Sequence, residues 1–317
     1  MTNATFGADT TTDEVLAGLD LSGTTVLVTG GSGGLGAETV RALSSHGARV
    51  IATARDTAKA GKALAEIGVD VGGAVSVEEL DLASLASVRA AADRINDRYD
   101  ELQLLIANAG VMACPQGTTA DGFETQFGTN HLGHFVFVNR VLPLLVAGAP
   151  SRIVMLTSAG HRFGDIDLDD PNFERSPYTP FDSYHRAKTA NILFAMEADR
   201  RWRDLGVRAC AVHPGTIDDT DIQRHLDQAT IDVMLAHRIH TKTIPAGAAT
   251  SVWAGVVLPA DEMGGGYAED CHLSPVSDID PMTPEGRTGV RSYAVDPERS
   301  AALWTLSEEM VGERFEA

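Results

Sequence analysis

The sequence predicts an α/β protein built around one doubly wound parallel sheet, and two features support that prediction. From residue 21 onward, short β-branched runs alternate with longer amphipathic stretches. A glycine-rich turn stands where the first short run passes into the first amphipathic stretch. Repetition of strand, helix and strand favours parallel pairing through right-handed crossovers, with helices on both faces of the sheet. A length of 317 residues, of which 44% are hydrophobic, is enough for a large core.

The expected elements follow in a regular order. Residues 24–29 form a β-branched run, residues 34–46 a helical pattern that Gly47 ends, and residues 48–53 a second strand pattern. The later strands are expected at 74–80, 102–107, 152–157 and 207–212. The later helices are expected at 84–98, 121–147, 183–205, 219–239, 246–258 and 298–311.

Charge and cysteine content exclude several classes of partner. With 44 acidic against 25 basic residues, the net charge of −19 should repel nucleic acid and anionic membranes. Residues 1–20 lack the basic and apolar regions of a secretory signal, and the uncharged stretch 243–260 is too short to span a bilayer. The 3 cysteines form no CxxC pair, which fits a reducing compartment. We therefore expect a cytoplasmic protein.

The glycine-rich turn, Thr29-Gly-Gly-Ser-Gly-Gly-Leu-Gly36, lies at the first strand–helix junction. A pyrophosphate reaches the backbone N–H groups at a helix N-terminus only where no Cβ intervenes. The turn therefore predicts a dinucleotide phosphate site. A merely structural turn is the alternative in a chain with 31 glycines, but the position at the junction favours the functional interpretation.

The end of the second strand predicts a preference for NADP. NAD sites place a carboxylate there for the ribose 2′-hydroxyl, whereas this chain reads Thr53-Ala54-Arg55. The guanidinium of Arg55 can bind a 2′-phosphate, although an exposed strand-end arginine is the alternative. Residues 41–62 carry a local charge of +4, whereas residues 261–317 carry −9. A small basic patch thus lies where the adenosine end of a phosphorylated dinucleotide is expected.

Tyr184 and Lys188 stand one turn apart on the same face of a predicted helix. A phenol with a pKa of about 10 is a weak acid or base at neutral pH, and a nearby ammonium stabilises the phenolate. By chance, the chain's few tyrosines and lysines would produce this spacing roughly 0.06 times. The pair therefore indicates acid–base chemistry.

Several motifs follow in order along the chain: Thr29, Gly30, Gly34 and Gly36 in the turn, Asp81-Leu82, Asn108-Ala109-Gly110, Asn130, Ser158, and Tyr184 with Lys188. With this ordered set, the chain resembles the short-chain dehydrogenase/reductases over residues 21–312. Segments 127–134, 191–194, 213–215 and 303–307 are most similar to the retinol dehydrogenase-like branch and its soluble bacterial-type relatives. The resemblance implies a single Rossmann-like domain with about seven parallel strands, and a dimer or tetramer built through the long helices.

The resemblance also assigns roles. It implies that Tyr184 is the acid or base, that Lys188 lowers its pKa and binds the nicotinamide ribose, that Ser158 holds the substrate oxygen, and that Asn130 supports a proton-relay water. Alone, Asn130 is more typical of a surface or packing residue and Ser158 of an ordinary strand end, and only the ordered set of motifs favours the functional roles. The cofactor-binding residues it implies are Gly30, Ser32, Gly33, Gly34, Leu35, Gly36, Arg55, Asp81, Leu82, Asn108, Ala109, Gly110, Tyr184, Lys188, Pro214, Gly215 and Ile217. Asp81 would contact the adenine, Asn108 would shape the cleft, and residues 214–217 would border the nicotinamide.

Three features depart from or add to this pattern. Ala107 stands where the family commonly has a second asparagine, and the usual nicotinamide-capping threonine is replaced or shifted within residues 216–220. His131 and His134 lie three residues apart without a third ligand signature, so we expect helix packing or an interface there and no metal.

We therefore expect an NADP-dependent oxidoreductase that interconverts an alcohol and its ketone or aldehyde. Residues 1–20 would be a frayed polar lead-in, 21–260 the NAD(P)-binding catalytic domain, and 261–317 a C-terminal extension packed on that domain. Segments 159–182 and 216–240, with the tail, would form a pocket for a bulky, partly apolar substrate. The apolar candidates there are Phe163, Phe173, Tyr178, Phe181, Ile222, Leu226, Met234 and Leu235. The alternatives are an NAD-linked alcohol dehydrogenase and a catalytically silent cofactor-binding sensor.

Overall fold

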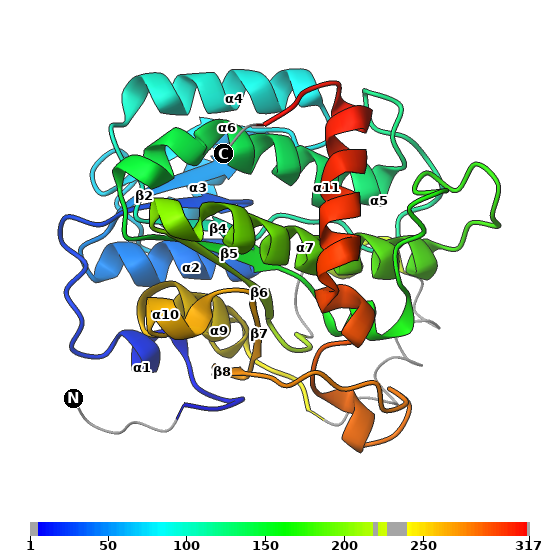
Figure 1. The fold of residues 1–317 in the computed structure, drawn as a ribbon. Coiled ribbons are helices and arrows are strands. Elements are labelled where there is room, and N and C mark those ends of the chain that lie inside the picture. Colours follow the sequence, from blue (N-terminus) through cyan, green and yellow to red (C-terminus); the bar gives the residue numbers. More distant parts are fainter. Residues whose placement is uncertain (1–5, 218–220, 227–239, 316–317) are drawn as a thin grey trace.

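The computed structural model describes residues 6–217, 221–226 and 240–315. Their strands form one sheet in the order β3-β2-β1-β4-β5-β6-β7-β8 (Figure 1). The strands are β1 Thr25–Thr29, β2 Arg49–Ala54, β3 Val75–Glu79, β4 Leu104–Ala107, β5 Ser151–Leu156, β6 Val207–His213, β7 Gly266–Glu269 and β8 His272–Leu273. Strands β1 to β7 are parallel and β8 pairs antiparallel to β7. The expected fold class, a doubly wound parallel sheet of about seven strands, is confirmed.

Helices cover both faces of this sheet (Figure 1). The helices are α1 Thr12–Leu16, α2 Gly34–Ser45, α3 Thr57–Glu66, α4 Leu85–Arg98, α5 Thr125–Phe127, α6 Gly133–Ala147, α7 Pro180–Trp202, α9 Ile244–Val256, α10 Ala260–Met263 and α11 Pro297–Val311. Leu27 of β1 packs into a core with α4, α6, α7 and α11, whereas its neighbours Val26 and Val28 pack into a second core with α1, α2 and α9. This alternation follows from the two-residue period of a strand.

The helix expected over residues 121–147 is interrupted. The Glu124 carboxylate accepts hydrogen bonds from the backbone N–H groups of Gln126 (3.0 Å) and Phe127 (2.7 Å), so the helix begins at residue 125. A π-helical turn, Gly128–Leu132, then separates α5 from α6. Such turns often occur at functional sites, and this one contains Asn130.

The expectation of a frayed lead-in is wrong for residues 12–16. Thr11 and Glu14 form a capping box at the start of α1, and Val15 and Leu16 are buried against the core. The sequence pattern also missed α3, β7 and β8. Strand β7 has four residues and begins with Gly266, which gives too short a run for a period to be recognised. Of the helix expected near residues 219–239, the structure describes one 3-10 turn at Asp221–Gln223; residues 218–220 and 227–239 lie outside the described residues.

The C-terminal helix α11 completes the core on the α7 side (Figure 1). The ring of Trp304 lies 5.0 Å from Phe135, 5.7 Å from Phe194 and 5.6 Å from Trp202, measured between ring centroids. His131 Nε2 lies 2.8 Å from the hydroxyl of Ser307 on α11. This face of α6 and α7 is therefore covered by the chain's own C-terminal helix. None of the helices in the described part of the chain combines the length and the apolar character that crossing a bilayer requires.

Burial of histidines predicts a loss of stability in mild acid. Burial lowers the pKa of His131 to about 3, of His134 to about 4 and of His161 to about 3. The unfolded chain has histidine pKa values of about 6.5, so below that pH it binds more protons than the folded chain does. Each such histidine then costs up to about 2 kcal/mol of unfolding free energy between about pH 6.5 and about pH 5.

We expect His131→Leu to make this acid slope shallower by about one proton. Urea denaturation between about pH 7.5 and about pH 5 measures the slope. A wild-type unfolding free energy that stays constant over this range would contradict the account.

Candidate active site

The carboxyl ends of the parallel strands place the candidate residues along one edge of the sheet. The order of the strands reverses between β1 and β4, which is where open α/β sheets bind ligands. Gly30 follows β1, Asn108 follows β4, Ser158 lies two residues after β5, and Pro214 follows β6. Residues distant in sequence therefore meet at this edge.

The glycine-rich turn is held closed by contacts that leave no room for side chains. A Cβ on Gly36 would lie 2.1 Å from the Gly30 carbonyl oxygen and 2.6 Å from Asn108 Nδ2. Asn108 Nδ2 donates to the carbonyl oxygens of Thr29 (2.9 Å) and Gly30 (3.3 Å). Gly30 has a φ of +66°, a conformation that favours glycine. Glycine is therefore required at both positions.

The start of α2 fits a diphosphate group. Gly33 caps the helix without a side-chain hydrogen bond, and a Cβ on it would meet nothing within 4 Å. The backbone N–H groups of Gly34, Leu35 and Gly36 belong to the first helical turn and have no intrahelical acceptor. Ser32 lies in the same turn and is partly exposed. Free N–H groups at an open helix N-terminus suit an anion, so the residues present fit a dinucleotide.

A buried hydrogen-bond chain joins this turn to the π-helical turn. The Thr29 hydroxyl accepts from the Ala109 backbone N–H (3.0 Å) and lies 2.9 Å from His134 Nε2. His134 Nδ1 lies 2.9 Å from the Asn130 backbone oxygen, which can only accept, so Nδ1 carries the proton. Thr29 then donates to Nε2 of a neutral imidazole. His134 thus connects the ends of β1 and β4 with the turn that contains Asn130, a packing role that the sequence analysis expected for it in general terms.

Tyr184 and Lys188 are buried on α7 beside the other catalytic candidates. Lys188 Nζ donates to the Leu156 carbonyl oxygen (3.1 Å) and lies 5.7 Å from the centroid of the Tyr184 ring. A Cβ on Gly110 would lie 3.2 Å from Asn130 Oδ1 and 3.5 Å from Lys188 Nζ. The structure therefore brings Tyr184, Lys188, Asn130 and Gly110 together.

Both polar atoms of the Asn130 side-chain amide hydrogen-bond to the Val111 backbone. Its Oδ1 accepts from the Val111 N–H (2.8 Å), and its Nδ2 donates to the Val111 carbonyl oxygen (2.9 Å). Asn130 therefore fixes the backbone next to Gly110. The Ser158 side chain lies close enough to the Tyr184 hydroxyl to act on its pKa, and its Oγ accepts from the Gly160 N–H (3.1 Å).

Burial controls the protonation of this cluster. It raises the pKa of Tyr184 to about 12, with the hydrogen bond from Ser158 acting in the opposite direction. It lowers the pKa of Lys188 to about 8. Burial is therefore a larger effect on Tyr184 than the stabilisation of a phenolate by Lys188. At neutral pH the phenol keeps its proton and can donate it.

The residues expected at the adenosine end lie beside the turn. The Gly31 N–H donates to the Thr53 carbonyl oxygen (3.1 Å), which holds the end of β2 against the turn, and Arg55 follows as an exposed side chain. The Asp81 carboxylate accepts from the Ala83 N–H (3.0 Å). Leu82 is buried under α6, where a Cβ on Gly133 would lie 2.4 Å from its carbonyl oxygen.

The basic patch expected from residues 41–62 is smaller in the structure. Arg41 pairs with Glu38 (2.7 Å) and with Asp13 (2.8 Å), so two nearby acids neutralise it. Arg49 begins β2 and therefore lies at the opposite end of that strand from the turn. Arg55 and Lys59, also within residues 41–62, form no ion pair among the described residues. These two are therefore the cations of the patch that remain available for a phosphate.

The segment after β6 reaches the glycine-rich turn through Ile217. A Cβ on Gly247 of α9 would lie 2.7 Å from Ile217 Cγ1 and 2.8 Å from Leu35 Cδ2. These three residues therefore pack against one another. Pro214 and Gly215 connect this contact to β6.

An apolar cluster surrounds Tyr184. Met112 and Ala113 are buried against it, and Phe181, Ile222 and Leu226 pack on the same cluster. Phe181, Ile222 and Leu226 were predicted from the sequence as pocket residues. Met112 and Ala113, which closely follow the Asn108 motif, were not. Other expected pocket residues lie elsewhere: Phe163 is 50% exposed, Phe173 and Tyr178 contact each other, and Met234 and Leu235 are outside the described residues.

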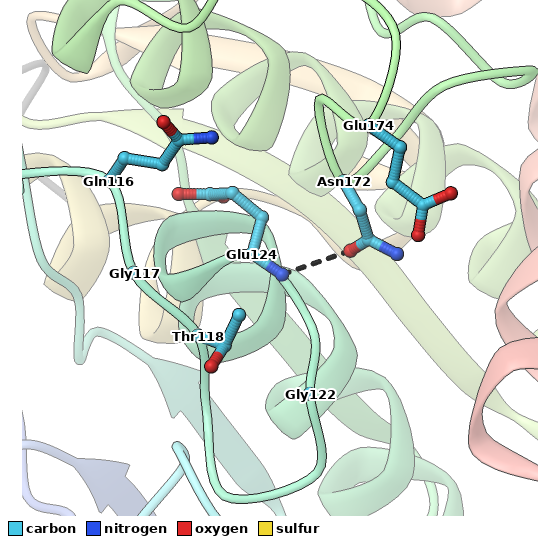
Figure 2. Close-up of a pocket in the computed structure, with 7 residues that line it drawn as sticks. All are labelled: Gln116, Gly117, Thr118, Gly122, Glu124, Asn172 and Glu174. Atoms are coloured by element: carbon cyan, nitrogen blue, oxygen red, sulfur yellow. Dashed lines mark hydrogen bonds between the residues drawn. The ribbon is translucent and has the colours of Figure 1, made fainter.

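A separate polar cavity of about 360 Å³ lies between two surface loops (Figure 2). Its lining residues are Gln116, Gly117, Thr118, Gly122, Glu124, Asn172 and Glu174. The Glu124 N–H donates to Asn172 Oδ1 (2.9 Å), which ties the loops together. None of the catalytic candidates lines this cavity. Within residues 6–217, 221–226 and 240–315, no group of three or more His, Cys, Asp or Glu side chains is arranged to hold a metal ion.

Comparison with known proteins gives consistent matches. The family model described as short chain dehydrogenase matches residues 24–230. Short-chain dehydrogenase/reductase prx1 of Penicillium roqueforti is 38% identical over 296 residues, covering 90% of this chain and 84% of the relative. Retinol dehydrogenase 14 of Homo sapiens is 38% identical over 309 residues, covering 92% of this chain and 87% of the relative. A crystal structure of an uncharacterised protein from Mycobacterium paratuberculosis superposes with a TM-score of 0.72 at 35% identity, covering 96% of this chain and 98% of that one. The expected resemblance, including the retinol dehydrogenase-like branch, is confirmed.

The close contact at Gly36 predicts a sharp loss of dinucleotide binding in Gly36→Ala. The added Cβ would collide with the Gly30 carbonyl oxygen and with the Asn108 side chain. We therefore expect the Kd for NADPH to rise at least about tenfold. Titration calorimetry measures this Kd directly. Gly61→Ala in α3 is the matched control, because its Cβ would have only one neighbour, at 3.8 Å, and NADPH binding should not change. Equal affinities for wild type and Gly36→Ala would contradict this account of the turn.

Proposed function

Since this chain belongs to the short-chain dehydrogenase/reductase family, whose members are NAD(P)-dependent enzymes, we propose that it interconverts an alcohol and its ketone or aldehyde, with NADP as the preferred cofactor. One observation carries the proposal. The buried Tyr184 and Lys188 and the partly exposed Ser158 lie at the same edge of the sheet as a helix N-terminus that suits a diphosphate.

The cofactor would lie along this edge. The backbone of residues 30–36 would hold the diphosphate, with Ser32 at its rim, and Arg55 would bind the 2′-phosphate. Asp81 and Leu82 would contact the adenine, and Asn108, Ala109 and Gly110 would line the cleft. Pro214, Gly215 and Ile217 would border the nicotinamide, and Lys188 would bind its ribose. When bound, NADP supplies or accepts the hydride.

Tyr184 and the side chains around it would carry out the proton transfer. In the reducing direction, Tyr184 donates a proton to the substrate oxygen, and the Ser158 hydroxyl donates a hydrogen bond to the same oxygen as negative charge develops on it. A Tyr184 pKa raised to about 12 keeps the phenol protonated at neutral pH, which is the state from which it can donate. The Lys188 ammonium would stabilise the phenolate that remains.

The substrate would be bulky and partly apolar. Met112, Ala113, Phe181, Ile222 and Leu226 pack with the Tyr184 side chain in one apolar cluster. An alcohol or carbonyl group there would reach Tyr184 and Ser158 while its hydrocarbon part contacts this cluster. Retinol, which the human relative's name gives as its substrate, is an alcohol of this general kind.

The remaining expectations stay predictions. We propose a cytoplasmic location, in line with three buried free cysteines.

A dimer or tetramer would have to use surfaces other than the part of α6 and α7 that α11 covers. An NAD-linked alcohol dehydrogenase and a silent sensor are the alternative functions, which the two experiments below separate.

Turnover with a panel of ketones and aldehydes, followed as NADPH oxidation, tests the reaction. We expect activity in the wild type, and a kcat lowered at least about 100-fold in Tyr184→Phe with the Kd for NADPH nearly unchanged. Tyr99→Phe is the control, because its hydroxyl contacts Ser76 away from the site. NADPH binding without turnover of any carbonyl would favour the sensor, and full activity in Tyr184→Phe would remove that residue from the mechanism.

Cofactor preference is tested at Arg55. Arg55→Asp should raise the KM for NADPH at least about tenfold more than the KM for NADH, because the carboxylate repels a 2′-phosphate and accepts from a 2′-hydroxyl. Arg49→Asp, at the other end of β2, should leave the ratio of the two KM values unchanged. An equal effect of Arg55→Asp on both cofactors would contradict the assignment.

A further inference from the structure

Lys242 is a buried cation that the proposed reaction does not use. Its side chain is only 3% exposed, and its Nζ lies 2.6 Å from the Asp270 carboxylate. The angles at this contact do not meet those of a well-formed hydrogen bond. The ammonium accordingly has no hydrogen-bond acceptor among the described residues. Burying an ammonium is costly, and a single partner repays little of that cost. Stability alone therefore gives a weak reason for a lysine at this position.

Lys242 holds the segment after β6 in two ways. Its backbone N–H donates to the Thr216 carbonyl oxygen (2.8 Å), and the two chains form a parallel bridge between Lys242 and Ile217. Its side-chain stem covers Gly215, where a Cβ would lie 2.7 Å from both Cδ and Cε. Gly215 also has a φ of +91°. The lysine stem therefore packs directly against the Gly215 backbone, in space that a side chain at residue 215 would need.

Asp270 is presented to Lys242 by a strained turn. Asp270 and Cys271 connect β7 to β8 with φ values of +52° and +57°, the tight hairpin geometry that asparagine and glycine adopt at least cost. The Cys271 N–H donates to the Thr250 hydroxyl on α9 (3.2 Å), which anchors the turn. Strained residues persist where the surrounding structure holds them, and they concentrate at functional sites. Here the turn places the Asp270 carboxylate against Lys242, whose side chain and backbone contact Gly215 and Ile217.

We propose that Lys242 and Asp270 form a positioning pair that fixes the Gly215–Ile217 backbone against the nicotinamide end of the cofactor. The inference rests on the proposed function. The pair touches neither the substrate oxygen nor Tyr184. It acts by holding a backbone segment whose next contact, Ile217 against Leu35, lies on the glycine-rich turn. Loosening this segment would let the ring that carries the hydride move relative to Tyr184 and Ser158, while the diphosphate and adenosine contacts remain.

Lys242→Met tests the proposal, because methionine keeps the stem over Gly215 and removes the charge. We expect kcat to fall at least about tenfold and the primary deuterium isotope effect on kcat to rise toward its full value, since small misplacements slow the chemical step. The Kd for NADPH should change less than about threefold, because most of the contacts to it remain. Lys242→Arg should restore part of kcat, and Asp270→Asn should reproduce the loss if Lys242→Met fails to fold.

Arg208→Met is the matched control. Arg208 pairs with Asp199 (2.8 Å) at the opposite end of β6, so its loss should lower stability without changing kcat or the isotope effect. Lys242→Met and Asp270→Asn with wild-type kcat and isotope effect would overturn the positioning role. A wild-type protein that binds no NADPH and turns over no carbonyl would instead overturn the proposed function, and this inference with it.

Discussion

The arrangement of the site depends on the contact between Gly36 and the Gly30 carbonyl oxygen. A side chain at residue 36 would occupy the space of that oxygen, so the first turn of α2 could not close onto the end of β1. Asn108 secures the contact from β4 by donating to the carbonyl oxygens of Thr29 and Gly30. The strand order reverses at this point, and the crevice that results is where the remaining candidate residues gather.

Two further connections extend this contact across the sheet. Toward α7, the chain from Thr29 through His134 to the Asn130 backbone reaches the turn that lies beside Gly110 and Lys188. Toward α9, the packing of Leu35 against Gly247 and Ile217 reaches the segment that Lys242 holds. The turn proposed to bind the diphosphate, the proposed proton donor and the segment proposed to border the nicotinamide are thereby fixed relative to one another by buried contacts.

Local spacing made the fold and the main motifs predictable from the sequence. The glycine turn and the pair of Tyr184 and Lys188 are each determined within a few residues, because one helical turn or one strand–helix junction fixes their geometry. Ser158 and Asn130 needed the resemblance to a family, since a lone serine or asparagine carries no pattern. Their roles, like that of Arg55, remain proposals.

Contacts between distant residues could not be predicted in the same way. Counting charges over residues 41–62 gave a basic patch, but Asp13 neutralises Arg41 from a helix that a polar lead-in was not expected to form. Lys242 and Asp270 belong to no motif and meet because α9 and β7 are adjacent in the fold. The π-helical turn at Asn130 was hidden because an apolar pattern does not distinguish it from a continuous helix.

Transfer of an isotopic label tests the central claim most directly. NADPH that carries deuterium at C4 of the nicotinamide is incubated with the protein and a carbonyl that it turns over, and the alcohol is analysed by mass spectrometry. The account predicts one deuterium on the carbinol carbon from one of the two C4-labelled forms, and none from the other. The account would be contradicted if the cofactor bound but no ketone or aldehyde gave an alcohol, labelled or unlabelled.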